Sequence, residues 1–260
     1  MTPAVAIIGG TGLTRLDTLT ITHQEAGSTP YGEPSSPLIY GELNGRVVVF
    51  LARHGLDHTL PPHKINYRAN LWALHRLGVK QVIAVAAVGG IRDDMEPGVL
   101  AFPDQIIDYT WGRHGTFFED NLTQVTHIDF TEPYCGLLRE RLIQAARALN
   151  FDARESCTYA AAQGPRLETA AEIRRMERDG CDIVGMTGMP EAALARELGL
   201  RYATCAVVAN RAAGKIPGVT ITMAEIERNL LEGMGRVKTL LARVIPLLDE
   251  ATATGQTDGA

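Results

Sequence analysis

The stretch Ala6-Ile7-Ile8-Gly9-Gly10-Thr11-Gly12-Leu13 reads as an apolar strand that runs directly into a glycine-rich turn. Its strand part has no alternating polar residues, which is typical of a strand covered on both faces of a sheet. Similar apolar runs alternate with helical patterns along the chain, so we expect an α/β fold with a mixed, largely parallel sheet flanked by helices. The predicted strands span residues 4–8, 46–52, 81–88, 103–109, 156–162, 182–186 and 201–209. The predicted helices span residues 65–77, 135–149, 168–179, 190–198 and 222–249.

Turn residues add detail to this outline. The pair Asn44-Gly45 tolerates the positive φ angles of a two-residue hairpin, so one antiparallel pair is expected at an edge of the sheet. Pro190 suits the first turn of a helix. Thr222 and Glu225 have the spacing of a capping box at the start of the last helix. The polar stretch 110–126 lacks a core pattern, and we expect a mobile loop there.

Composition and charge argue against several classes of protein. The chain has 260 residues, 45% of them hydrophobic and 21% charged, and we expect one domain over 1–250 with a disordered tail over 251–260. The net charge of −5 includes no basic stripe, so no nucleic-acid partner is expected. Neither a membrane-spanning run nor an export signal is visible, and the four cysteines are far apart. These features predict a cytoplasmic protein with reduced cysteines and no membrane contact.

The glycine-rich turn has three interpretations. A dinucleotide-binding fingerprint needs a third glycine, but Gly10-Thr11-Gly12 is followed by Leu13-Thr14-Arg15. The turn therefore suits a single small anion better, held by backbone N–H groups and the Thr11 hydroxyl. A purely structural turn is the third possibility. A nicotinamide-dependent oxidoreductase stays open as a rival function.

Polar residues at the carboxyl ends of other predicted strands suggest a shared pocket, because we expect all of these strands to be parallel. Arg53 offers a planar fork suited to phosphate and His54 adds a donor beside it, although a surface arginine with a packed histidine fits equally. Glu168 can accept an N–H from a base edge or simply complement a helix dipole. Asn210 can bind a purine edge or form a turn. Nearby histidines lack metal-ligand spacing, so no metal is expected. Together the residues indicate a site for phosphate and a planar heterocycle.

With these motifs in view, the chain resembles the trimeric nucleoside phosphorylases, the family of purine nucleoside phosphorylase and methylthioadenosine phosphorylase, over about residues 4–249. The resemblance implies a nucleoside phosphorylase fold, a homotrimer, and reversible cleavage of an N-glycosidic bond by inorganic phosphate. It implies no metal or organic cofactor, because phosphate is the co-substrate. The motifs that carry it are Gly9-Gly10-Thr11-Gly12-Leu13, Ala52-Arg53-His54-Gly55, Asn66-Tyr67-Arg68-Ala69-Asn70, Gly89-Gly90, Gly164-Pro165-Arg166-Leu167-Glu168-Thr169 and Gly185-Met186-Thr187-Gly188-Met189-Pro190-Glu191.

The resemblance also implies roles for individual residues. Met186 would lie under the ribose, and His127 would complete the site of a neighbouring subunit. Ala86 stands where methylthioadenosine phosphorylases have a threonine, so one hydroxyl donor is missing. The residues implied to hold phosphate are Thr11, Arg53, His54, Ala86, Ala87 through its backbone, and Thr187.

Three positions predict the substrate. Methylthioadenosine phosphorylases have serine in place of Glu168 and an Asp-x-Asp pair in place of Asn210-Arg211-Ala212, whereas 6-oxopurine enzymes resemble this chain. A 6-oxopurine presents N1–H to a carboxylate and O6 to an amide N–H, and adenine reverses that pattern. Met223 stands where ordinary purine nucleoside phosphorylases have a histidine for the 5′-hydroxyl, and its thioether suits a methylthio group unless it is only a core residue.

These features combine to predict a pentosyltransferase for S-methyl-5′-thioinosine, with His54, Glu168 and Asn210 as catalytic residues. The 6-amino analogue methylthioadenosine and general 6-oxopurine nucleosides are the alternative substrates. A non-catalytic nucleoside-binding protein is the rival from another class.

Overall fold

The computed structural model describes residues 3–120 and 122–248, and in this part of the chain eleven strands form one sheet. The strands are β1 Val5–Gly9, β2 Thr20–Glu25, β3 Leu38–Leu43, β4 Arg46–Ala52, β5 Gln81–Gly90, β6 Leu100–Ala101, β7 Gln105–Asp108, β8 Ala153–Arg154, β9 Thr158–Ala161, β10 Ile183–Gly185 and β11 Arg201–Arg211. The α-helices are α1 Tyr67–Arg76, α2 Gly136–Ala148, α3 Ala170–Arg178, α4 Gly188–Glu197 and α5 Met223–Val244, and two short 3-10 helices span Pro62–Lys64 and Ile245–Leu247.

The sheet confirms the predicted mixed α/β architecture. Its strand order is β2-β3-β4-β1-β5-β10-β9-β7, with β11 on the other side of β5 and β6 and β8 beyond it. The pairs β1–β4, β1–β5 and β5–β11 are parallel. The β3–β4 hairpin has the predicted turn, with φ angles of 48° at Asn44 and 80° at Gly45. Antiparallel pairing is not confined to that edge, because β10 also runs antiparallel to β5.

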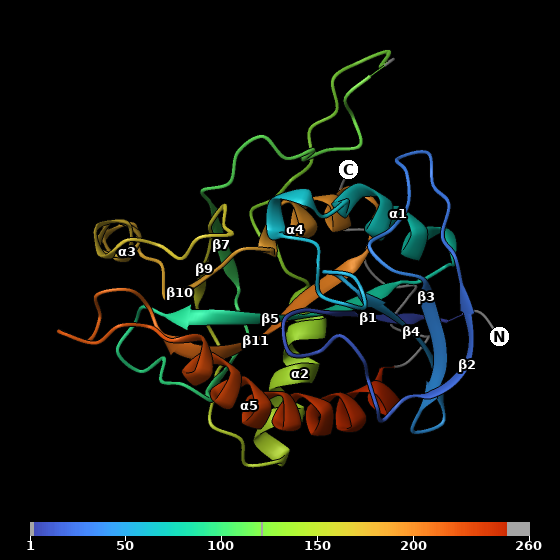
Figure 1. Ribbon diagram of the computed structural model, residues 1–260. Coiled ribbons are helices and arrows are strands. Elements are labelled where there is room, and N and C mark those ends of the chain that lie inside the picture. Colours follow the sequence, from blue (N-terminus) through green and yellow to red (C-terminus); the bar gives the residue numbers. More distant parts are fainter. Residues whose placement is uncertain (1–2, 121, 249–260) are drawn as a thin grey trace.

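Helices cover both faces of the sheet (Figure 1). On one face α5 packs beside α2, and the buried residues Leu230, Met234, Val237 and Leu241 of α5 recur at helical spacing. On the other face lie α1 and α4, with Leu71 of α1 in the same core cluster as α4 residues. The central strands β1, β5 and β11 are therefore covered on both sides, which explains their continuous apolar sequence.

Several elements differ from the sequence-based expectation. Strand β2 was not predicted, because its six residues are exposed and its sequence is largely polar. Helix α3 starts at Ala170, after the cap residue Thr169, and α5 ends at Val244 rather than near 249. The expected tail over 251–260 lies outside the described residues. The long connection from β7 to α2 extends away from the body of the molecule (Figure 1).

Candidate active site

The carboxyl ends of two strands meet at one edge of β5. Strand β1 runs parallel to β5 and pairs with Gln81–Ala84, whereas β10 runs antiparallel and pairs with Gly89–Gly90. The two strands therefore approach the intervening stretch Val85–Val88 from opposite directions. As a result, the glycine-rich turn after β1 and the Met186-Thr187 segment after β10 reach the same place. The expectation that parallel strands deliver every site segment is thus wrong for β10, because short apolar strands carry no local signal of their direction.

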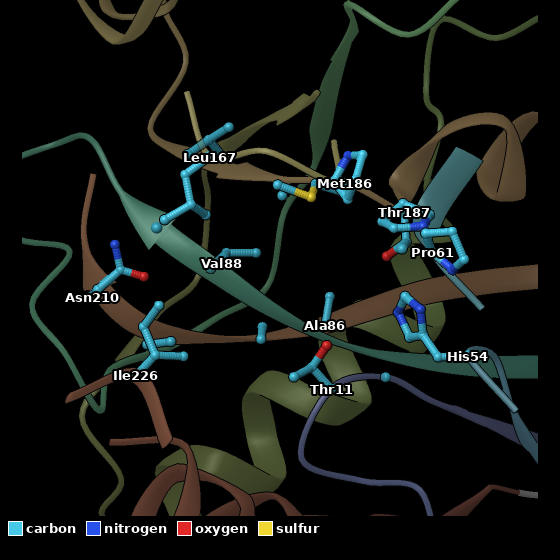
Figure 2. Close-up of a pocket in the computed structure, with 18 of the residues that line it drawn as sticks. Thr11, His54, Pro61, Ala86, Val88, Leu167, Met186, Thr187, Asn210 and Ile226 are labelled. Atoms are coloured by element: carbon cyan, nitrogen blue, oxygen red, sulfur yellow. The ribbon is translucent and has the colours of Figure 1, made fainter. Parts of the chain in front are cut away.

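A cavity of about 420 Å³ lies over this stretch of β5. Its volume is within the roughly 300–1,000 Å³ usual for small-molecule sites. Thr11, His54 and Thr187 gather at one end, which we call the phosphate end, and Asn210 lies at the other, which we call the base end (Figure 2). The predicted site residues that line the cavity are Thr11, Arg53, His54, Ala86, Ala87, Glu168, Met186, Thr187, Asn210, Ala212 and Met223.

Two predicted site residues lie outside this cavity. The guanidinium of Arg211 points to the segment after β5, where its Nη1 donates to the carbonyls of Arg92 and Asp93 at 2.8 and 3.0 Å. Its side chain is thereby engaged away from the cavity, and the expectation that it contacts substrate is not supported. His127 is exposed on the long connection between β7 and α2. Its expected contribution to a neighbouring subunit stays a prediction.

The glycine-rich turn brings backbone close to a charged side chain. Leu13 N–H donates to the Gly10 carbonyl at 3.0 Å, and Gly12 has a φ of +82°, which favours glycine. A Cβ atom on Gly10 would lie 2.9 Å from Nη1 of Arg53 and 2.5 Å from the Val85 carbonyl oxygen. The packing of the turn therefore requires glycine, as the structural interpretation expects. Gly10 and Thr11 also line the cavity, and anion binding by the turn stays a prediction.

Arg53 is held rigidly at the end of β4. Its Nε and Nη2 donate to the two carboxylate oxygens of Glu191 at 2.6 and 2.8 Å, and its Nη1 donates to the Val85 carbonyl at 3.0 Å. Burial is the largest single influence and by itself would lower the pKa of Arg53, but the charge of Glu191, its hydrogen bonds to Arg53 and the nearby tyrosines together raise that pKa. Of the five N–H groups of an arginine, these bonds use three. The other two remain for a ligand in the cavity that Arg53 lines.

His54 differs from its expected role as a donor. Its Nδ1 lies 2.8 Å from the Leu60 carbonyl, which only accepts, so Nδ1 carries the proton. Burial, together with the charge of Arg53, lowers the pKa of His54 to about 4. The neutral ring therefore offers its Nε2 lone pair as an acceptor. The prediction of a second donor beside Arg53 is wrong for this tautomer, because the tautomer depends on a backbone carbonyl six residues away.

Glu168 and Asn210 both line the cavity, and Asn210 lies at the base end together with Leu167, the chain neighbour of Glu168 (Figure 2). Helix α3 is capped by Thr169 and Glu172, which form a reciprocal capping box, so Glu168 is not needed as the cap. Burial raises the pKa of Glu168, while its own backbone N–H bonds its carboxylate. The Asn210 amide donates one hydrogen to the Arg211 carbonyl at 2.8 Å. Its second N–H and its carbonyl oxygen remain for a ligand.

Sequence reasoning missed the roles of two residues around the cavity. Glu191 had a signal, since it ends a quoted motif and a buried arginine needs an acidic partner. Arg113 had none, because it lies in the polar stretch 110–126. Its guanidinium donates to the backbone carbonyls of Met186 at 2.9 Å and Gln163 at 2.8 Å. The stretch that was expected to be mobile is therefore tied at Arg113 to the segments that form the cavity wall.

The described residues form neither a metal-binding cluster nor a membrane-spanning helix. Within residues 3–120 and 122–248, no group of three or more His, Cys, Asp or Glu side chains is placed to hold a metal ion. Among the helices of this described part, none has the length and apolarity needed to cross a bilayer.

Comparison with known proteins identifies the family. The sequence model of the phosphorylase superfamily matches residues 4–246. The chain belongs to the phosphorylase superfamily. Among proteins similar to this phosphorylase, a probable S-methyl-5′-thioinosine phosphorylase from Pseudomonas syringae pv. tomato is 58% identical over 240 residues, 92% of this chain and 97% of that protein. The 6-oxopurine nucleoside phosphorylase of Pyrococcus furiosus is 44% identical over 261 residues, 98% of this chain and 97% of that protein.

Solved structures agree with the sequence comparison. Methylthioadenosine phosphorylase from Schistosoma mansoni in complex with adenine superposes with a TM-score of 0.91 at 32% identity, covering 96% of this chain and 94% of that chain. The predicted nucleoside phosphorylase fold is confirmed, as is the prediction of a pentosyltransferase of the purine nucleoside phosphorylase type. The predicted homotrimer and the cytoplasmic location stay predictions.

Proposed function

We propose that this phosphorylase cleaves S-methyl-5′-thioinosine with inorganic phosphate, reversibly, to hypoxanthine and 5-methylthioribose 1-phosphate. One observation carries the proposal: Glu168 and Asn210 line the same cavity as Arg53 and two threonines, and Asn210 lies at the end opposite Thr11 and Thr187 (Figure 2). One cavity thus offers a carboxyl group and an amide for a purine, and an arginine and two threonines for an anion. No metal or organic cofactor enters the proposed reaction.

The phosphate end has the chemistry of an oxyanion site. Arg53 contributes its two remaining N–H groups, and Thr11 and Thr187 contribute hydroxyls. His54, as an acceptor, takes the hydrogen of monoprotonated phosphate at Nε2. Ala86 has no hydroxyl, so this position of β5 offers the phosphate no side-chain donor.

The base end favours a 6-oxopurine. The ionised carboxylate of Glu168 accepts N1–H, and the unused N–H of Asn210 donates to O6 or N7. An adenine ring would set its N1 lone pair against the carboxylate and leave buried polar groups unpaired, which reduces selectivity for it by factors of up to ~10⁴ in favourable cases. The names of two relatives, an S-methyl-5′-thioinosine phosphorylase and a 6-oxopurine nucleoside phosphorylase, support this base.

The apolar 5′ group is assigned to the wall at the start of α5. Met223, Ile221 and Ile226 line the cavity there. A polarizable thioether and two branched side chains suit a methylthio group better than a hydroxyl. The names of the relatives differ in the 5′ group. The name of the Pyrococcus furiosus relative, 6-oxopurine nucleoside phosphorylase, supports a general 6-oxopurine nucleoside as the second candidate substrate.

The proposed chemistry conserves atoms and charge. The C1′–N9 bond breaks with its electron pair moving to the purine, which leaves an oxocarbenium-like sugar. A phosphate oxygen held beneath C1′ forms the new C1′–O bond. The purine anion takes a proton from solvent, and the new phosphate ester releases to solvent the proton of monoprotonated phosphate, so the products are the neutral base and the sugar-phosphate dianion. Asn210 stabilises the negative charge that develops on the purine, and the bound phosphate stabilises the cationic sugar.

The test is a comparison of three nucleosides. The enzyme is incubated with phosphate and with methylthioinosine, methylthioadenosine or inosine, and the released base is followed by chromatography. We expect phosphate-dependent release that is fastest from methylthioinosine. Preference for the adenine compound would overturn the roles of Glu168 and Asn210, and equal use of inosine would favour the second candidate. Ligand binding without base release would indicate a non-catalytic binding protein, and tight NAD(H) binding without phosphorolysis would indicate an oxidoreductase.

A further inference from the structure

We infer that Asn229 on α5 is a positioning residue that holds the strand bulge from which Asn210 faces the purine. The inference rests on the proposed function and deepens it, because base recognition by Asn210 of β11 then depends on a hydrogen bond from α5. Asn229 itself does not line the cavity.

The bulge is visible in the register of β11 against β5. The two strands pair one to one from Arg201 opposite Gln81 to Val208 opposite Val88. Asn210, not Ala209, is then opposite Gly89, so β11 contains one extra residue at Ala209. Side chains alternate along a regular strand, and a bulge interrupts that alternation and redirects the residues that follow.

Without the extra residue, Asn210 would share the face of Val208. On that face Val208 belongs to a core cluster with Met95 and Tyr159. The bulge therefore places Asn210 on the opposite face of β11 from Val208, level with Gly89 of β5, and both Asn210 and Gly89 line the cavity. Figure 2 shows its amide at the base end, beside Ile226 of α5.

Asn229 supplies the hydrogen bond that the bulge requires. Its Nδ2 donates to the Ala209 carbonyl at 2.7 Å. Ala209 is only 2% exposed, so its carbonyl needs a partner within the protein. Asn229 lies one helical turn beyond Ile226, and the same helix therefore both forms a wall of the cavity and holds the strand that carries Asn210.

The residues after the bulge are held as well. Arg211 donates to carbonyls of the Arg92–Met95 segment, and Ala212 N–H donates to the Gly90 carbonyl at 2.8 Å. Asn210 thus lies between two anchors, one on α5 and one on the segment after β5. The predicted contact of Arg211 with substrate is replaced by this anchoring contact.

A positioning role has a specific signature. The groups of the phosphate end are carried by other parts of the chain, with Thr11 after β1, Arg53 after β4 and Thr187 before α4. Loss of the Asn229 bond should therefore impair recognition of the base while the apparent affinity for phosphate is retained. A general loss of structure would affect both ends of the cavity.

The experiment compares two isosteric substitutions. Asn229→Asp replaces the amide donor by a carboxylate that cannot donate to Ala209. Asn44→Asp makes the same change at an amide that donates to the Ala242 carbonyl of α5 at 2.8 Å, and Asn44 does not line the cavity. Asn229→Ala removes the donor without adding charge, and carries the test if the aspartate variant does not fold. Circular dichroism and thermal unfolding show which variants are folded.

The readouts are kcat/KM for the 6-oxo and 6-amino nucleosides and the KM for phosphate. We expect Asn229→Asp and Asn229→Ala to lower kcat/KM for the 6-oxo nucleoside by about tenfold or more and to reduce the preference for it, with the phosphate KM within about twofold of wild type. Asn44→Asp should match wild type in all three.

Folded Asn229 variants with wild-type kcat/KM and wild-type preference for the 6-oxo nucleoside would overturn the inference. An equal rise in the KM for the nucleoside and the KM for phosphate would overturn it as well. A wild type without phosphorolysis would overturn the proposed function and, with it, the inference.

Discussion

Arg53 and Glu191 form a bidentate ion pair in the interior, with side-chain exposures of 1% and 0% and a shortest N–O distance of 2.6 Å. Glu191 accepts a further hydrogen bond from the Tyr202 hydroxyl at 2.8 Å. Two oxygens and two nitrogens in one plane prevent rotation of the guanidinium. Its orientation toward the cavity is therefore set by a residue on α4 that is 138 positions away in the sequence.

Replacing Glu191 should damage both stability and phosphate binding. Glu191→Gln leaves the buried Arg53 cation without its counter-charge, and we expect the free energy of unfolding to fall by about 3–5 kcal/mol. The phosphate KM should rise, since the guanidinium is no longer fixed. Urea denaturation and steady-state kinetics measure the two effects. In the control Glu155→Gln, which breaks the exposed pair with Arg147, the loss should be below about 1 kcal/mol. Equal losses in both variants would contradict this account.

The state of His54 predicts a pH dependence of stability. Its pKa is about 4 in the folded protein and has the ordinary value of about 6.5 in the unfolded chain. The unfolded chain therefore binds more protons below pH 6.5, and the free energy of unfolding should fall as the pH decreases from 6.5 to 4. At pH 5 the titration of His54 lowers the free energy of unfolding by roughly 2 kcal/mol relative to neutral pH.

His54→Gln keeps a donor for the Leu60 carbonyl and should flatten this dependence in urea unfolding at pH 7 and pH 5. His114→Gln, at an exposed histidine, should retain the wild-type slope. Identical slopes in wild type and His54→Gln would show that His54 does not titrate in this way.

Asn210→Asp should change the preferred base. A carboxylate removes the N–H that faces O6 or N7 of a 6-oxopurine and can accept from the 6-amino group of adenine. We expect the ratio of kcat/KM for methylthioinosine to that for methylthioadenosine to fall by about tenfold or more, a typical effect of an exchanged hydrogen-bonding group. The change Asn44→Asp is the matched control. An unchanged ratio would place base selectivity elsewhere.

Met223 predicts selectivity at the 5′ position. Its side chain is 62% exposed at the start of α5 and lines the cavity. Met223→His introduces a polar group that can bind a 5′-hydroxyl, so the preference for methylthioinosine over inosine should fall by roughly 10-fold or more. Leu231→His, at an exposed position of the same helix, should leave the ratio unchanged. If both variants keep the wild-type ratio, another wall of the cavity selects the 5′ group.

Ala86 offers a gain of function. It faces the cavity beside Thr11 (Figure 2), and Ala86→Thr would add a hydroxyl donor there. A hydrogen bond to a charged group contributes about 1.5–3 kcal/mol, so the phosphate KM should fall by roughly tenfold. Ala86→Val has nearly the same shape without the hydroxyl and should show no such gain. A threonine variant that behaves like the valine variant would indicate that phosphate does not reach this position.

The main strands were predictable because their signal is local. The expected strands over 46–52, 81–88 and 201–209 correspond to β4, β5 and β11, since long apolar runs identify strands covered on both faces. The site residues at their ends were found for the same reason, as polar or glycine residues that directly follow such runs. The direction of β10 was not predictable, because a three-residue strand has no turn or helix of its own that reveals its orientation.

The amino-acid sequence by itself determined the α/β class, the family, and a set of residues most of which line the cavity, because strand length, apolar periodicity and motif residues are properties of neighbouring positions. The tertiary structure alone decided the partner of Arg53, the tautomer of His54, the direction of the Arg211 side chain away from the cavity, and the bulge held by Asn229. Each of these depends on hydrogen bonds between a side chain and a carboxylate or backbone carbonyl that only folding brings together. Local sequence patterns carry no record of those pairings.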